Sequence, residues 1–331
     1  MELEQIKNIM DKNELFVRIC AKYLNEYERL ITDELMREIT GGDARFEENA
    51  FAHFISSAFL DDDELEARML KEYFIPSVKK ISPDEYKANP YINNIPITDQ
   101  KIGAWTLSYQ KYAPYEAFVR DDFTLFDDYR EVCNLGFFSE EYSFPTVFEN
   151  GVEWMAIKPN EIETMKSPIE GANGRVVTFG LGMGYFAYMS HLKSSVSSVT
   201  VIERDKSVIE LFKAHILPHF DKPEKIKIIE ADAFDYAENV VPREGYDYAF
   251  VDIWHDTADG VELYIKMKKL EHLSKNTHFE YWIERSILVS IRKSIFYAIY
   301  ESEKRGQNKL TIEEIEKRLE FDYLKEFVKF L

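Results

Sequence analysis

Between residues 175 and 284 the sequence alternates short β-rich runs with segments of helical periodicity, an order that few folds accommodate. The β-rich runs span residues 175–179, 198–203, 226–231, 246–252 and 277–283. The helical segments between them span residues 185–193, 206–217, 232–240 and 258–273. Strands that alternate with helices form parallel sheets through right-handed crossovers, which place helices on both faces. The sequence therefore predicts an α/β fold built on a mostly parallel sheet.

A glycine-rich turn follows the first of these strands, in the stretch VVTFGLGMGY at residues 176–185. Gly180, Gly182 and Gly184 stand at alternate positions, although the chain holds only 13 glycines. Without Cβ atoms they allow a tight turn and let a ligand lie against the backbone, near a helix N-terminus that favours negative charge. Dinucleotide-binding folds use G-x-G-x-x-G, whereas Tyr185 stands at the third glycine position here. We expect cofactor binding at this turn; a tight strand-to-helix connection without a ligand is the alternative.

Acidic residues end the next three strands. Glu203 ends the second strand, where a carboxylate can accept hydrogen bonds from both hydroxyls of a ribose. Asp232 ends the third strand, where it can accept the exocyclic amine of an adenine while the N–H of Ala233 faces the ring. Asp252 ends the fourth strand, at the edge where open α/β sheets bind ligands. The glycines and these acids together predict an adenosine-containing cofactor.

The four motifs resemble, in order and spacing, those of class I S-adenosylmethionine-dependent methyltransferases. The resemblance covers residues 175–284 and implies a Rossmann-like sheet with S-adenosyl-L-methionine as the cofactor. It implies that the glycines line the methionine and ribose portions, that Glu203 binds the ribose, and that Asp232 and Ala233 bind the adenine. The predicted cofactor-binding residues are Gly180, Gly182, Gly184, Tyr185, Glu203, Arg204, Asp232, Ala233 and Asp252.

The stretch TVFENGVEWMAI places Asn150-Gly151 between two β-rich arms, which predicts a two-residue hairpin turn. This hairpin, followed by a short helix from Pro159, resembles the strand unit that precedes the same fold in spermidine synthases. Those enzymes use a decarboxylated donor and carry an acid in the glycine turn. The corresponding residues here are Leu181, Met183 and Tyr185, so methyl transfer is preferred to aminopropyl transfer.

Two features depart from the methyltransferase pattern. Thr178 stands where an acid commonly precedes the glycines, which removes a carboxylate partner for the amino group of the donor. Residues 285–331 have helical periodicity, with a capping box at Thr311–Glu314, so no antiparallel strand pair is visible after the fifth strand. We expect a shortened sheet with a helical C-terminal cover.

Candidate catalytic residues follow the fourth strand: Asp252, His255 and Asp256. Methyl transfer requires alignment, and also a base where the acceptor must lose a proton. Each of the three could supply that base, but Asp256 could instead cap the following helix and His255 could be structural. Trp254 between them could belong to the core. No metal site is predicted, and Cys20 and Cys133 are expected to be core residues.

The chain divides into four predicted regions. Residues 1–100 form an N-terminal helical domain and residues 101–170 a strand-rich connector with the hairpin. Residues 171–284 form the S-adenosylmethionine-binding domain and residues 285–331 the C-terminal helical cover. The N-terminal helices and the aromatic-rich residues 91–145 could roof the site, and they are equally compatible with the interface of a homodimer.

The net charge of −19 bears on partners. An acidic surface repels nucleic acid and anionic membranes, so both are disfavoured, whereas a cationic small-molecule substrate would be attracted. No apolar run is long enough for a transmembrane helix, and the N-terminus lacks the pattern of a secretory signal. We therefore expect a cytoplasmic enzyme that transfers methyl groups to an unidentified small molecule. Aminopropyl transfer, donor binding without catalysis, and a nicotinamide cofactor are the alternatives.

Overall fold

The computed structural model describes residues 3–60, 63–306 and Glu314. Contacts between Cα atoms divide the chain into two compact units, each assembled from three segments. The first unit holds Met1–Asn89, Tyr109–Phe144 and Lys158–Glu163, and the second holds Pro90–Ser108, Pro145–Ile157 and Thr164–Leu331. The predicted regions are contiguous, whereas these units interleave, because the chain between residues 89 and 164 passes repeatedly from one unit to the other.

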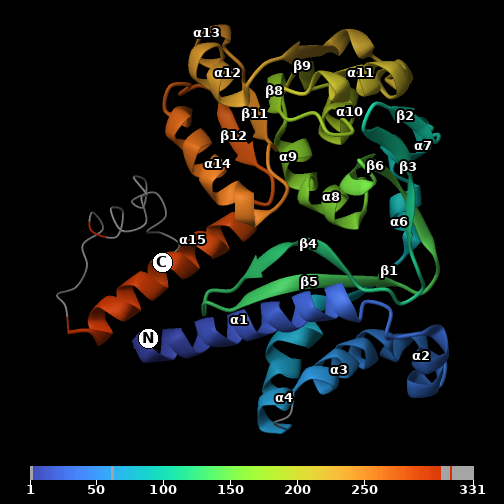
Figure 1. Cartoon of the computed structure of the whole chain (residues 1–331), viewed down its shortest axis with the longest axis vertical. Coiled ribbons are helices and arrows are strands. Elements are labelled where there is room, and N and C mark those ends of the chain that lie inside the picture. Colours follow the sequence, from blue (N-terminus) through green and yellow to red (C-terminus); the bar gives the residue numbers. More distant parts are fainter. Residues whose placement is uncertain (1–2, 61–62, 307–313, 315–331) are drawn as a thin grey trace. The chain divides into compact units, whose positions relative to one another are not determined.

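The first unit combines helices with a small sheet (Figure 1). Its helices are α1 (Leu3–Glu26), α2 (Asp33–Thr40), η1 (Ala44–Phe46), α3 (Glu47–Phe59), α4 (Asp63–Met69), the π-helix η2 (Leu70–Phe74), α5 (Ile75–Ser77), α6 (Pro83–Lys87) and most of α8 (Pro159–Thr164). Its sheet has the order β1 (Val78–Ile81), β5 (Glu131–Phe138), β4 (Phe118–Leu125). Residues 1–100 were predicted to form a helical domain, but Val78–Ile81 is a strand, because it pairs in parallel with β5.

Apolar residues spaced three or four apart place one face of α1 in the core of this unit. Phe16, Ile19 and Tyr23 are buried there, and the predicted core residues Cys20 and Cys133 lie in the same cluster. Burial raises the pKa of both thiols. The pKa of Cys133 reaches about 12. The two cysteines are therefore inert core residues with free thiols, as expected.

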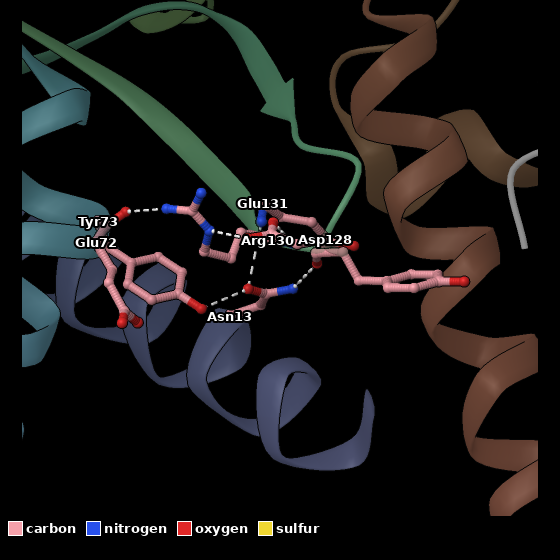
Figure 2. A network of polar contacts seen from close by, with 7 residues as sticks. Asn13, Glu72, Tyr73, Asp128, Arg130 and Glu131 are labelled. Carbon is pink, nitrogen blue, oxygen red and sulfur yellow. Dashed lines mark hydrogen bonds and ion pairs between the residues drawn. The ribbon is translucent and has the colours of Figure 1, made fainter. Parts of the chain in front are cut away.

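A polar network holds the turn between β4 and β5 against α1 and η2 (Figure 2). Asn13 donates from Nδ2 to the carbonyl oxygen of Tyr129 at 2.8 Å and accepts from the Tyr73 hydroxyl at 3.0 Å. Arg130 donates to the carbonyl oxygen of Glu72 at 3.2 Å. Tyr129 has φ +70°, which is uncommon for a side chain of this size. The network thus stabilises a strained turn of the first unit.

The second unit is built on a five-stranded parallel sheet (Figure 1). The strand order is β10 (Ile226–Glu230), β9 (Val196–Glu203), β8 (Gly174–Phe179), β11 (Tyr248–Val251), β12 (His278–Tyr281). The first strand of this sheet in the sequence, β8, is central. The next two strands, β9 and β10, lie on one side of it and the last two, β11 and β12, on the other, which is the 3-2-1-4-5 order of doubly wound folds. All residues of β11 are buried, as in sheets covered on both faces. The predicted parallel α/β sheet is confirmed.

The second unit also contains helices, several of which flank this sheet in Figure 1. They are α7 (Pro90–Asn94), α9 (Lys166–Gly171), α10 (Tyr185–Leu192), α11 (Lys206–His215), η3 (Leu217–His219), η4 (Pro223–Lys225), α12 (Ala233–Asn239), α13 (Val241–Glu244), α14 (Thr257–Glu271) and α15 (Glu284–Lys304). Helix α15 confirms the helical prediction up to Lys304. No strand follows β12 in residues 282–306 or at Glu314, and the capping box at Thr311–Glu314 lies, apart from Glu314, outside the described residues.

A further sheet has the order β2 (Gln100–Ile102), β3 (Trp105–Tyr112), β6 (Tyr142–Glu149), β7 (Val152–Ala156). Glu149 pairs with Val152 across the predicted turn, where Asn150 and Gly151 have φ of +52° and +83°. The two-residue hairpin is therefore confirmed. In the described part of the chain, no helix is both long and apolar enough to cross a bilayer.

Candidate functional site

The glycine turn links β8 to α10, and its three glycines all have positive φ. A Cβ atom on Gly180 would lie 1.9 Å from the carbonyl oxygen of Asp252, and one on Gly184 would lie 2.2 Å from the ring of Phe212. Gly184 is also the N-cap of α10. Backbone conformation and packing within the chain therefore both require glycine at these two positions.

Met155 of the hairpin covers the middle glycine. A Cβ atom on Gly182 would lie 2.3 Å from the Met155 sulfur, and the same sulfur lies 3.2 Å from the backbone nitrogen of Met183, which donates to it. The sequence predicted bare backbone for a ligand at Gly182, whereas a side chain of the protein lies there. The role of the three glycines in cofactor binding stays a prediction.

Tyr91 of α7 contacts the next peptide of the same turn. Its hydroxyl donates to the carbonyl oxygen of Met183 at 2.6 Å, and its ring lies edge-on to that of Tyr185, with 5.6 Å between centroids. Tyr91 is fully buried and Tyr185 nearly so. The predicted cofactor residue Tyr185 therefore lies in the packing beneath the turn. The sequence did not reveal Tyr91 and Met155 as contacts of the turn. Their partner Met183 lies 92 and 28 positions further along the chain, and no local pattern marks such distant contacts.

Glu203 fixes the turn from the end of β9. Its Oε2 accepts the N–H of Leu181 at 3.1 Å and its Oε1 accepts the N–H of Asp205 at 2.8 Å. The residue is 9% exposed, so the carboxylate is almost buried against the glycine turn. The adjacent Arg204 is exposed, and its side chain has no polar partner among the described residues.

Asp232 caps α12 after β10. Its Oδ1 accepts the N–H groups of Phe234 and Asp235 at 2.9 and 3.0 Å, while Oδ2 has no hydrogen-bond partner among the residues described. Asp232 is exposed and Ala233, the first residue of α12, is half-buried. An exposed carboxylate oxygen beside a helix N-terminus can accept a ligand amine. Asp232 lies two residues beyond the end of β10, whose last residue, Glu230, pairs with Glu203.

Asp252 continues β11 beyond Val251, and its N–H donates to the carbonyl oxygen of Phe179 at 2.9 Å. Burial of its carboxyl group raises the pKa to about 7, and the nearby negative charge of Glu203 adds to the shift. The described residues donate no hydrogen bond to this carboxyl group. Asp252 is therefore a carboxylic acid that changes charge near neutral pH at the carboxyl edge of the sheet.

The other two candidate catalytic residues belong to the start of α14. Asp256 is its N-cap, accepts the N–H of Ala258 at 2.6 Å and forms a capping box with Asp259. His255 is exposed, and its N–H donates to Asp259 Oδ1 at 3.1 Å. The contacts of Asp256 and His255 thus stabilise the N-terminus of α14. The catalytic roles of both residues stay predictions.

Two tryptophans, Trp254 and Trp154, lie at or near the loop between β11 and α14. Trp254 is buried between Tyr264 and Tyr281, with ring centroids 6.4 Å from each, so it is a core residue. Trp154, next to Met155, packs edge-on against Trp105 at 4.8 Å and lies 6.4 Å from the imidazole of His255. The hairpin thereby approaches the loop after β11 within the second unit.

The structure brings the glycine turn, Glu203 and Asp252 together at the carboxyl edge of β8, β9 and β11, with Asp232 just beyond the end of β10. Thr178, the departure before the glycines, is buried in β8. A pocket of about 210 Å³ is lined by other residues of this unit: Pro96, Ile97, Thr98, Gln100, Leu107, Ala214, His215 and His219. The described residues contain no cluster of three or more side chains suited to a metal ion.

Comparison with known proteins finds no matching family model and no matching curated protein. Among solved structures, the spermidine synthase from Thermotoga maritima is 14% identical, with a TM-score of 0.33, over 45% of this chain and 54% of that one. An SAH-bound methyltransferase from Podospora anserina is 16% identical, with a TM-score of 0.28, over 34% of this chain and 46% of that one. The chain spans about half the length of these proteins. A likeness of this extent does not identify a family or an activity.

Proposed function

We propose that the second unit binds S-adenosyl-L-methionine at the carboxyl edge of its parallel sheet and transfers the methyl group to a small-molecule acceptor. The observation that carries the proposal is the set of carboxylates at the ends of β9, β10 and β11, with a glycine turn after the central strand β8. The strand order reverses beside β8, which is where open α/β sheets bind nucleotides.

The residues fit an adenosyl group better than they fit its amino-acid tail. Asp232 Oδ2 is exposed and has no partner in the described part of the chain, so it could accept the adenine amine beside the N–H of Ala233. Glu203 already accepts two backbone N–H groups, but each carboxylate oxygen has a second lone pair for a ribose hydroxyl. Met155 lies where the tail would contact Gly182, and would have to move.

Asp252 would act as the general base. A pKa of about 7 leaves the carboxyl group partly ionised at neutral pH, where it can take a proton from the attacking nitrogen or oxygen of the acceptor. The bound donor supplies an electrophilic methyl group and leaves as a thioether. The net charge of −19 favours a cationic acceptor such as an amine, since an acidic surface attracts it.

Isothermal titration calorimetry with S-adenosylhomocysteine measures binding to the parent chain and to two variants. Asp232→Asn is the test variant, and Asp235→Asn, at an exposed position of the same helix, is the control. We expect Asp232→Asn to weaken binding about tenfold, the loss of one charge-assisted hydrogen bond, and Asp235→Asn to leave it unchanged. Equal affinities for all three proteins would contradict the assigned site.

Activity is tested with isotopically labelled S-adenosylmethionine and a panel of amines, thiols, phenols and carboxylates. Transfer of label that is lost in Asp252→Asn supports the mechanism. Binding without transfer to any class would instead favour a donor-binding protein. Stronger binding of the decarboxylated donor than of the intact one would favour aminopropyl transfer.

A further inference from the structure

The hairpin strand β7 delivers one side chain to the glycine turn. The sulfur of Met155 lies 3.2 Å from the nitrogen of Met183, and 2.3 Å from where a Cβ atom of Gly182 would be. Met155 is only half-buried, and its contact with the nitrogen of Met183 is part-buried. Its thioether therefore has the position that a ligand would need in order to contact the same backbone.

The local backbone aims Met155 at this position. The register of β6 with β7 shifts between Val147, which pairs with Met155, and Phe148, which pairs with Glu153. Irregularities of this kind redirect side chains and recur beside binding sites. The intervening Trp154 is fixed by the ring of Trp105 at 4.8 Å, which keeps the shifted segment in place.

The bond that Met155 forms is easily exchanged. A thioether is a weak hydrogen-bond acceptor, and methionine is unbranched with several rotatable bonds. A carboxylate would accept the N–H of Met183 far more strongly, and the N-terminus of α10 favours negative charge beside it. The carbonyl oxygen of Met183, which belongs to the next peptide unit, is held independently by Tyr91, so residue 183 stays anchored when Met155 leaves.

We propose that Met155 is an internal occupant of the glycine turn, and that a ligand binds there by displacing it and offering a carboxylate to the N–H of Met183. The proposal rests on the proposed function, because S-adenosylhomocysteine is the probe ligand. Met155 thereby lowers the affinity of the site, while the N–H of Met183 favours a ligand tail that carries an acceptor. A tail that carries only a hydrogen-bond donor would leave the N–H of Met183 without a partner.

The experiment compares three proteins: the full chain, Met155→Ala and Val152→Ala. Val152 lies at the exposed start of the same strand, so it controls for changes in the hairpin. S-adenosylhomocysteine is titrated into each by calorimetry. The full chain with ¹³C-methyl-labelled methionine is then titrated by NMR, and the Met155 signal is assigned from its absence in Met155→Ala.

We expect Met155→Ala to bind about fivefold more tightly than the full chain, because the ligand no longer displaces a side chain. Val152→Ala should bind as the full chain does, and the Met155 methyl signal should move at saturation. If the full chain binds but Met155→Ala binds no more tightly, or the Met155 signal stays in place, the occupant role is wrong and the proposed function survives. If none of the three proteins binds, the proposed function fails and the occupant role fails with it.

Discussion

At the level of single residues, Gly180 is the glycine whose replacement the chain tolerates least. Its φ is +94°, and a Cβ atom would lie 1.9 Å from a backbone oxygen, which cannot rotate away as a side chain can. Gly245 has a similar φ of +69° but no described atom within 4 Å of its Cβ position. A side chain at Gly245 would incur only backbone strain, whereas one at Gly180 would incur strain and a steric clash. Comparing the two substitutions therefore isolates the free-energy cost of the clash.

We predict that Gly180→Ala lowers the free energy of unfolding by roughly 3 kcal/mol, and Gly245→Ala by only about 1 kcal/mol. Denaturant unfolding of the two variants and the parent chain measures the difference. Equal losses would mean that the loops after β8 and β11 separate readily, which would contradict the close approach of Gly180 to Asp252.

Asp252 makes stability depend on pH. Its pKa is about 7 in the folded chain against a reference of 3.8, so the folded state binds the proton more tightly than the unfolded state. This contribution to stability is complete below about pH 4 and is lost as the pH rises through about 7. The sign is opposite to that of a carboxylate held in an ion pair.

We predict that Asp252→Asn loses less stability than the parent chain between about pH 5 and about pH 8, because an amide has no proton to release. The variant should also melt at a higher temperature at the upper pH. Thermal unfolding followed by circular dichroism at both pH values measures this. Parallel losses in the two proteins would show that Asp252 has an ordinary pKa.

Among the elements, the short helix α7 anchors the glycine turn through one side chain. It places the Tyr91 hydroxyl on the carbonyl oxygen of Met183, inside the second unit. We predict that Tyr91→Phe costs about 1–3 kcal/mol, because a buried carbonyl loses its donor. The half-exposed Tyr109 on β3 provides the control, and Tyr109→Phe should change little.

Chemical denaturation gives the two free energies of unfolding. Titration with S-adenosylhomocysteine adds a second readout, since a turn without its anchor should bind more weakly. An unchanged stability in Tyr91→Phe would indicate that water replaces the hydroxyl.

The elements also show what the sequence can and cannot reveal. The five strands and the hairpin could be predicted, because hydrophobic runs and the Asn150-Gly151 pair are local signals. Strand β1 could not, because VKKI becomes a strand only by pairing with residues 135–138 far along the chain. For the same reason the sequence marked Gly182 as a place of close approach but did not reveal that Met155 makes it.

At the scale of the whole molecule, interleaving makes the second unit depend on two early segments. Residues 90–108 supply Tyr91, which donates to the carbonyl oxygen of Met183, and residues 145–157 supply Met155, which accepts its N–H. We predict that a fragment of residues 164–306, which holds the entire parallel sheet, melts at a lower temperature than the second unit of the full chain. Hydrogen exchange at the Met183 amide, compared between fragment and full chain, checks this locally. Equal protection would contradict the anchoring role of these segments.

The interleaved order also affects synthesis. Tyr91 leaves the ribosome about 190 residues before Tyr281 completes the last strand of the sheet, a delay of roughly 10–40 s at common translation rates. Tyr91 and Trp105 are buried in the finished unit, so during this interval they are unshielded. A nascent chain of this kind exposes aromatic side chains until the second unit is complete, and slower translation lengthens the period in which it can aggregate.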